Sequence, residues 1–79
     1  MKITASYIGR NTYEVKVDDH TELYTEPFFN SPEKYTRRIV SLVESFNMND
    51  INVTDTDIWS ALEKAAEEAG RYFPNCLTY

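Results

Sequence analysis

The sequence predicts an α+β fold, in which a three-stranded antiparallel β-meander is followed by two α-helices packed on one of its faces (β-β-β-α-α). Two observations lead to this prediction. Residues 1–26 contain three runs of alternating apolar and polar residues, whereas residues 31–73 contain two stretches with apolar residues at helical spacing. A chain of 79 residues is expected to form one domain, spanning 1–79.

The meander is predicted from its period-two pattern and from the turns between the runs. The first two runs surround residues 9–11 (GRN), which are typical of a hairpin turn. A third, less regular run over 21–25 follows a polar turn at 18–20. It stops before Pro27, which lacks the backbone donor that a strand needs. The residues expected to face the helices are Tyr13, Val15, Val17 and Leu23.

The first helix is predicted over 31–47. Ser31 suits the N-cap, Pro32 suits the first helical position, and Glu33 suits the positive end of the helix dipole. Glu33 is also placed to pair with Arg37 one turn later. The apolar stripe that should face the sheet consists of Tyr35, Ile39, Leu42, Val43 and Phe46.

The second helix is predicted over 55–73 and is preceded by the segment NVTDTDIW. Thr54 and Asp57 have the spacing of a capping box, and Thr56 is the alternative cap. The expected apolar stripe consists of Ile58, Leu62, Ala65, Ala69 and Phe73. The expected ion pairs one turn apart are Lys64–Glu68 and Glu67–Arg71. Pro74 ends the helix and begins an apolar tail over 74–79, which either folds back on the sheet or docks on another chain.

No motif in the sequence indicates a metal site, a cofactor site or a catalytic site. His20 and Cys76 are the only histidine and cysteine and lie far apart, so we expect no zinc site. A calcium loop starting at Asp50 would have Asp55 in place of the required glycine. No titratable pair or nucleophile–base arrangement indicates an enzyme, and no glycine-rich loop indicates a bound phosphate. The beginning of the chain has no signal-peptide pattern and no apolar run has the length of a membrane span, so we expect a cytoplasmic protein without a membrane partner.

The charge is unevenly distributed along the chain. Residues 1–43 hold six basic and six acidic residues, whereas residues 44–79 hold two basic and seven acidic residues, so the whole net charge of −5 lies in the second part. This distribution disfavours direct binding of nucleic acid and favours a larger protein with a basic surface as the partner. Of the adjacent phenylalanines at 28 and 29, we expect one ring in the core; the other either packs there as well or lies on the partner surface. The candidate partner-binding residues are Asp55, Asp57, Glu63, Glu67, Glu68 and Phe29.

Two functional hypotheses follow. In the first, the chain is a non-catalytic interaction protein that blocks a larger nucleic-acid-binding host protein by presenting carboxylates in place of phosphates. In length, acidity and lack of a recognisable site it is similar to phage-encoded inhibitors of host defence such as anti-CRISPR proteins, a likeness of size and charge that transfers no residue roles. In the second, it is an antitoxin-type dimeric regulator that contacts nucleic acid through Lys34, Arg37 and Arg38. The edge strands of an open three-stranded sheet would also allow a homodimer.

Overall fold

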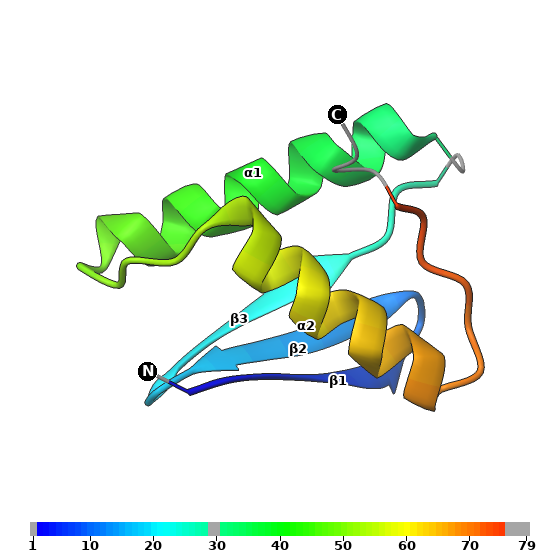
Figure 1. Cartoon of the computed structure of the whole chain (residues 1–79), viewed down its shortest axis with the longest axis horizontal. Helices are drawn as coiled ribbons and strands as arrows, with labels where there is room; N and C mark the ends of the chain where they lie inside the picture. The colour runs from blue at the N-terminus through cyan, green and yellow to red at the C-terminus, as the bar shows by residue number, and fades with distance from the viewer. Residues whose placement is uncertain (1, 29–30, 76–79) are drawn as a thin grey trace.

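The computed structural model describes residues 2–28 and 31–75 and confirms the α+β order β-β-β-α-α (Figure 1). The strands are β1 (Ile3–Gly9), β2 (Thr12–Val17) and β3 (His20–Thr25), and the helices are α1 (Pro32–Met48) and α2 (Asp55–Glu68). The sheet is antiparallel with the order β1-β2-β3. Both helices lie on one face of the sheet, α1 against β3 and α2 mainly against β1.

The hairpin between β1 and β2 closes through a tight turn at Arg10 and Asn11. Both residues have positive φ, 54° and 56°, and Gly9 before them has φ 94°. The register shifts between Tyr7 and Gly9, which is the irregularity that a β-bulge introduces. Positive φ at both central residues is the mark of a type I′ turn, whose twist matches that of the flanking strands. The hairpin predicted from residues 9–11 therefore forms, with a non-glycine residue, Arg10, in a left-handed conformation.

Alternate residues of each strand lie on the inner face of the sheet. In β2 these are the predicted residues, whereas in β3 the other set of alternate residues lies on this face. The two-residue turn at Asp18 and Asp19 pairs Val17 with His20, so that Tyr24 lies opposite Tyr13 and is buried. The prediction that Leu23 faces the helices is wrong, because Leu23 is on the outer face and is 60% exposed. Strand side chains alternate between faces, so the register set by this turn determines which of the two neighbours is buried.

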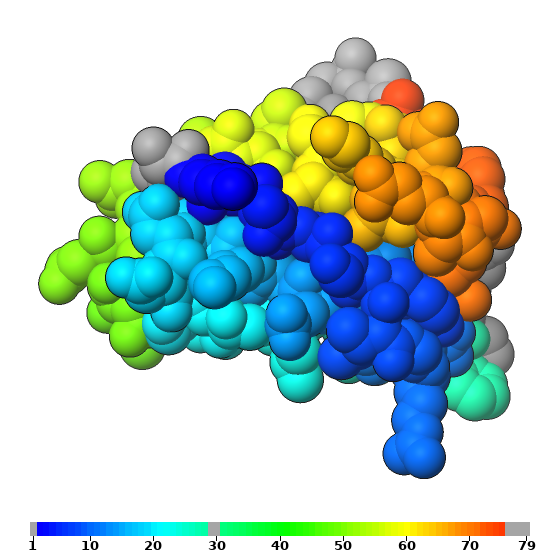
Figure 2. Space-filling view, turned by 90° about the horizontal axis from the view of Figure 1, so that it is seen from below, coloured from blue at the N-terminus to red at the C-terminus, as the bar shows by residue number. Residues whose placement is uncertain are grey.

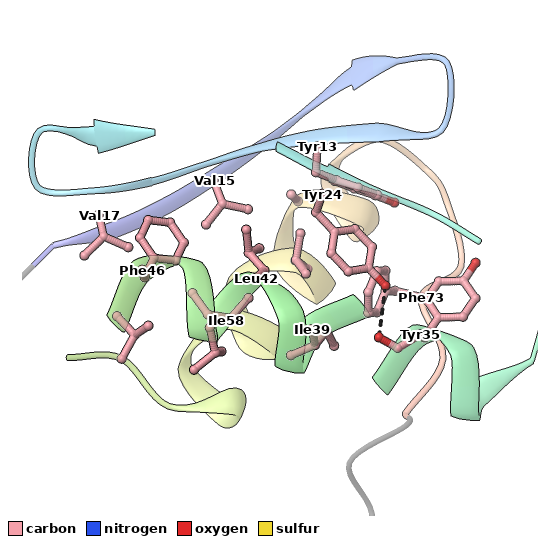
Figure 3. Close-up of a cluster of buried hydrophobic side chains, with 14 of the residues drawn as sticks. Tyr13, Val15, Val17, Tyr24, Tyr35, Ile39, Leu42, Phe46, Ile58 and Phe73 are labelled. Atoms are coloured by element: carbon pink, nitrogen blue, oxygen red, sulfur yellow. Dashed lines mark hydrogen bonds between the residues drawn. The ribbon is translucent and has the colours of Figure 1, made fainter. Parts of the chain in front are cut away.

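The hydrophobic core lies between this inner face and the two helices (Figure 3). Val15 and Val17 pack above Phe46 at one end, and the aromatic rings gather at the other. There, Phe73 packs at 5.1 Å from the Tyr35 ring and at 5.9 Å from the Tyr13 ring, both edge to face. The fully buried large side chains are Tyr13, Tyr24, Phe46, Ile39, Ile58, Leu62, Val15 and Val17.

The second helix is shorter than predicted, ending at Glu68 rather than at 73. Gly70 has φ 70°, the N–H of Arg71 donates to the carbonyl of Ala66, and the N–H of Gly70 donates to the carbonyl of Glu67. These two bonds and the left-handed glycine form a Schellman cap. Ala69 is consequently exposed, and the buried Phe73 reaches the core from an extended segment rather than from the helix.

The helix starts differ in how closely they follow the expected caps. The capping box at α2 is confirmed: the Thr54 hydroxyl accepts from the N–H of Asp57 and the Asp57 carboxylate accepts from the N–H of Thr54, both at 3.2 Å. Ser31 occupies the N-cap of α1, but its side chain makes no capping bond. The Glu33–Arg37 pair is also confirmed, at 3.0 Å. The segment NVTDTDIW is therefore a helix start, with Thr54 and not Thr56 as the cap.

Candidate interaction surface on the second helix

The acidic residues of α2 are divided between two sides of the helix. Ile58, Leu62, Ala65 and Ala66 are buried against the sheet and set the orientation of the helix. Glu63 and Glu67 follow each other by one turn on the side turned away from the sheet; Glu63 is half-buried and Glu67 is exposed. Neither forms an ion pair within the described part of the chain. We call these two residues the acidic face of α2.

Glu68 lies on the other side of the helix, towards β1. Together with Lys64 and Ala61 it lines a shallow cavity of about 200 Å³ along β1. Figure 2 looks onto this edge of the molecule and shows α2 lying along β1. The predicted ion pair between Lys64 and Glu68 is absent from the described residues. The structure thus separates Glu68 from the acidic face.

The two aspartates at the start of α2 stabilise the first turn of the helix. One Asp57 oxygen accepts the N–H of Thr54 in the capping box. Asp55, half-buried, lies in the same first turn, where a negative charge is favourable at the positive end of the helix dipole. Both carboxylates therefore stabilise the helix irrespective of any partner. Phe29, the remaining candidate, lies outside the described residues.

Arg71, which follows the end of α2, belongs to a cluster of side chains that the sequence did not predict. Instead of pairing with Glu67, its guanidinium forms an ion pair with Glu26, donates to the Asn11 side chain at 2.9 Å and lies 4.4 Å from the centre of the Tyr7 ring. The hydrogen bond to Glu26 raises the pKa of Arg71, so this side chain stays protonated. The cluster lies where the segment after α2 crosses the β1–β2 turn.

Glu26 is the buried partner in this cluster. It is 8% exposed, and its second oxygen accepts the hydroxyl of Tyr35 at 3.1 Å. Burial of the phenol, reinforced by the negative charge of Glu26, raises the pKa of Tyr35 to about 12. Burying a carboxylate is costly unless it is paired and hydrogen-bonded, and here Arg71 and Tyr35 supply both partners. No sequence signal links residues 45 positions apart such as Glu26 and Arg71.

Because Arg71 pairs with Glu26, the surface of α2 has little positive charge. Residues 55–68 contain five carboxylates and one basic residue, Lys64. Arg71, which the sequence would have placed one turn after Glu67, neutralises Glu26 instead. Trp59, half-buried and one turn before Glu63, donates its indole N–H to the carbonyl of Pro74 at 3.0 Å and so holds the following segment against the helix. The acidic face therefore carries two carboxylates that form no ion pair within the described chain.

The basic residues of α1, the candidates of the alternative hypothesis, lie along the side of that helix next to β3. Arg37 pairs with Glu33, and Arg38 donates to the carbonyl of Thr25 at 3.0 Å. Lys34, Arg37 and Arg38 line a cavity of about 490 Å³ with Pro27 and Phe28, and the Phe28 ring is 93% exposed. These side chains form a local basic region, in which Arg37 and Arg38 bind groups of the same chain.

Other groups of chemical interest are few in the part of the chain that the structure describes. His20 pairs with Glu22 on β3 and packs against Phe46, which accounts for the one histidine. Within residues 2–28 and 31–75, no three side chains of the types that bind metals come together as a metal site. No helix in the same ranges is both long and apolar enough to span a bilayer.

No known family model matches the chain, and comparisons with curated proteins and with solved structures find no match either.

Proposed function

We propose that this chain is a small, non-catalytic protein-binding module whose acidic face, Glu63 and Glu67, contacts a basic surface of a larger protein. The observation that carries the proposal is that neither glutamate has an ion-pair partner in the described chain: Arg71 is bound to Glu26 instead, which leaves Lys64 as the one basic residue of the helix. Like charges held close together on a helix repel each other, and a cationic partner relieves that repulsion. Opposite charge also accelerates the encounter with such a partner.

The partner that best fits this surface is a protein that itself binds nucleic acid. Such a protein has a groove lined by lysine and arginine for the phosphates of its ligand. Carboxylates one turn apart on a rigid helix can occupy that groove and exclude the nucleic acid. We therefore propose inhibition of a nucleic-acid-binding host protein, in the manner of phage-type inhibitors of host defence, as the biological role.

The test is a tagged pull-down from host lysate after nuclease treatment, comparing three forms of the chain. The first is the unchanged protein, the second carries Glu63→Lys and Glu67→Lys, and the third carries Glu14→Lys and Glu44→Lys. Glu14 and Glu44 are exposed and lie outside α2, so the two variants have the same net charge. We expect one protein to be retained by the unchanged chain and the control variant and to be lost from the α2 variant. Equal retention by all three would refute the role of the acidic face.

The same experiment addresses the alternative, an antitoxin-type regulator that uses the basic residues of α1. In that case recovery would vanish with nuclease, and purified DNA would be retained at low salt only while Arg37 and Arg38 are present. Their existing contacts with Glu33 and the Thr25 carbonyl argue against this alternative, because a phosphate would have to displace them.

A further inference from the structure

The free edge of β1 has none of the side chains that usually prevent a strand from pairing with another chain. β1 is the first strand of the sheet, and its seven residues, ITASYIG, include no charged residue and no proline. Charged side chains, prolines and bulges normally protect such an edge. The register shift of β1 lies only at its end, between Tyr7 and Gly9. At the opposite edge of the sheet, Arg38 of α1 already binds the carbonyl of Thr25. β1 is therefore the edge that is open to pairing.

Every second residue of β1 turns its backbone groups to this edge. The N–H of Asp18 donates to the carbonyl of Lys2, so these two residues form a hydrogen-bonded pair of the β1–β2 ladder. Bonded pairs alternate along an antiparallel ladder, so the next residues of β1 that bond to β2 are those at positions 4 and 6. The intervening residues direct their N–H and C=O groups outward; they are Ile3, Ala5 and Tyr7. Figure 2 looks onto this edge and shows β1, in blue, with no other segment in front of it.

A second copy of β1 matches these outward groups. Ile3 and Tyr7 lie symmetrically about Ala5, so a twofold axis beside Ala5 pairs Ile3 of each copy with Tyr7 of the other, and Ala5 with Ala5. Three such pairs exchange about six hydrogen bonds and join the two sheets into one. On the face that carries the helices, each Tyr7 ring then lies beside an Ile3 side chain, and such aromatic–β-branched neighbours stabilise a sheet.

The charges of α2 beside this edge favour a second copy over an unrelated peptide. Lys64 and Glu68 line the shallow cavity of about 200 Å³ between α2 and β1, and neither forms an ion pair within the described chain. A twofold axis reverses the direction of the second α2, which brings Lys64 of each copy within reach of Glu68 of the other. This side of α2 is therefore complementary to itself, whereas a peptide with charges of one sign would meet one like charge. Surface pairs of this kind add selectivity rather than much affinity.

We propose that the chain forms a reversible homodimer through β1, in which the two β1 strands pair antiparallel about a twofold axis at Ala5. Interfaces carry about one hydrogen bond per 100–200 Å², so about six backbone bonds indicate roughly 600–1,200 Å² of buried surface. This area is at the low end for specific interfaces, so we expect a dissociation constant in the micromolar range. The acidic face of α2 lies on the other side of that helix from Glu68 and stays exposed, so the dimer carries it twice. The proposal does not depend on the partner of that face.

The test is sedimentation velocity of the purified chain from about 1 µM to about 1 mM, a range that includes micromolar dissociation constants. The unchanged chain should convert from monomer to dimer within this range. In the proposed register, Thr4 of one copy lies opposite Ser6 of the other, so a variant with Thr4→Lys and Ser6→Lys places like charges opposite each other. This variant should dimerise more weakly by about tenfold or more.

The matched control carries Thr21→Lys and Leu23→Lys on β3. These two residues flank Lys16 and Glu14 of β2 from the other side, in the same register as the two residues changed on β1. All four altered positions are exposed, and the two variants have the same net charge. The control should dimerise like the unchanged chain, because its added charges lie away from the β1 edge.

A second variant of the edge adds no charge. Ala5→Pro removes an outward N–H at the centre of the interface and leaves the bonds to β2 in place, so it should also weaken the dimer. Circular dichroism and the urea midpoint confirm that each variant folds. Amide hydrogen exchange supplies a direct readout, since the amides of Ile3, Ala5 and Tyr7 should exchange more slowly as the protein concentration rises.

Three results would overturn the proposal. The first is a chain that stays monomeric over the whole concentration range. The second is a dimer that the β1 variants leave intact or that the β3 control weakens equally. The third is concentration-dependent protection of the Thr21 and Leu23 amides instead of those of β1, which would place the interface at the opposite edge of the sheet.

Discussion

Arg71 and Glu26, 45 positions apart in the chain, form an ion pair whose carboxylate side is closed to solvent. Glu26 belongs to the end of the meander and Arg71 follows the Schellman cap of α2, so the pair joins the two halves of the fold. The hydroxyl of Tyr35 in α1 completes it. One buried carboxylate thereby connects β3, α1 and the segment after α2. The first three predictions concern this cluster.

Replacing Arg71 by methionine should destabilise the protein by about 2–4 kcal/mol, because removal of one partner leaves Glu26 charged and buried. Lys64→Met is the matched control, since Lys64 is exposed and has no ion pair within the described chain. Urea denaturation of the two variants measures the difference. Similar losses in both variants would show that the pair contributes nothing beyond an ordinary surface charge.

The stability of the protein should respond differently to removal of the Tyr35 hydroxyl and of the Tyr13 hydroxyl. Tyr35 donates to Glu26, so Tyr35→Phe should cost about 1–2 kcal/mol. The hydroxyl of Tyr13 is buried beside the Arg71 guanidinium and makes no well-aligned hydrogen bond among the described residues. Tyr13→Phe should therefore be neutral or stabilising, by up to about 1 kcal/mol. The free energy of unfolding is measured for both variants. A larger loss of stability for Tyr13→Phe than for Tyr35→Phe would contradict the hydrogen bonding described for the two hydroxyls.

Stability should decrease at alkaline pH as a result of the raised pKa of Tyr35. This phenol has a pKa of about 12 in the folded protein against 10.0 in the unfolded chain. Between these values the unfolded chain loses the proton first, so unfolding becomes easier as the pH rises through 10 and up to 12. At about 1.4 kcal/mol for each pH unit, the loss attributable to Tyr35 approaches about 2–3 kcal/mol. In Tyr35→Phe, the slope of unfolding free energy against pH should be shallower over this range. An unchanged slope would remove Tyr35 as its source.

The capping box predicts an unequal effect of two neighbouring threonines. Thr54→Ala removes an acceptor for the N–H of Asp57 and should cost about 1 kcal/mol. Thr56→Ala, on the exposed side of the first turn, should change stability by less than about 0.5 kcal/mol. Thermal or urea unfolding of both variants tests which threonine is the cap, and the reverse order of losses would rule out Thr54.

The β1–β2 turn should be improved by a residue that tolerates positive φ. Arg10 has φ 54°, a conformation that costs an ordinary L-residue about 1 kcal/mol. Asparagine adopts it readily, so Arg10→Asn should stabilise the protein by about 0.5–1 kcal/mol. Lys16→Asn, at an exposed strand position with ordinary φ, is the control for the loss of a surface charge and should not stabilise. A raised urea midpoint in both variants would attribute the gain to charge rather than to the turn.

The features that the sequence determined by itself are local ones. The period-two runs, the apolar stripe of α1, the turn at Arg10 and Asn11 and the Thr54–Asp57 box all involve residues a few positions apart. Backbone geometry alone brings such residues together, so their spacing suffices to predict them. The order β-β-β-α-α followed from these elements. For the candidate site, the sequence identified the carboxylates of α2 but not how they are distributed around the molecule.

Tertiary packing decided the rest. Whether Leu23 or Tyr24 is buried depended on the register that the second turn imposes, because a shift of one residue reverses the faces of a strand. Phe73 fitted a helical stripe by spacing, but the cap at Gly70 ended the helix and the ring reached the core by another route. Arg71 had Glu67 within reach and pairs with Glu26, since a buried carboxylate gains far more from a counter-ion than an exposed one does. Such pairings depend on distances between elements, and these exist only once the chain has folded.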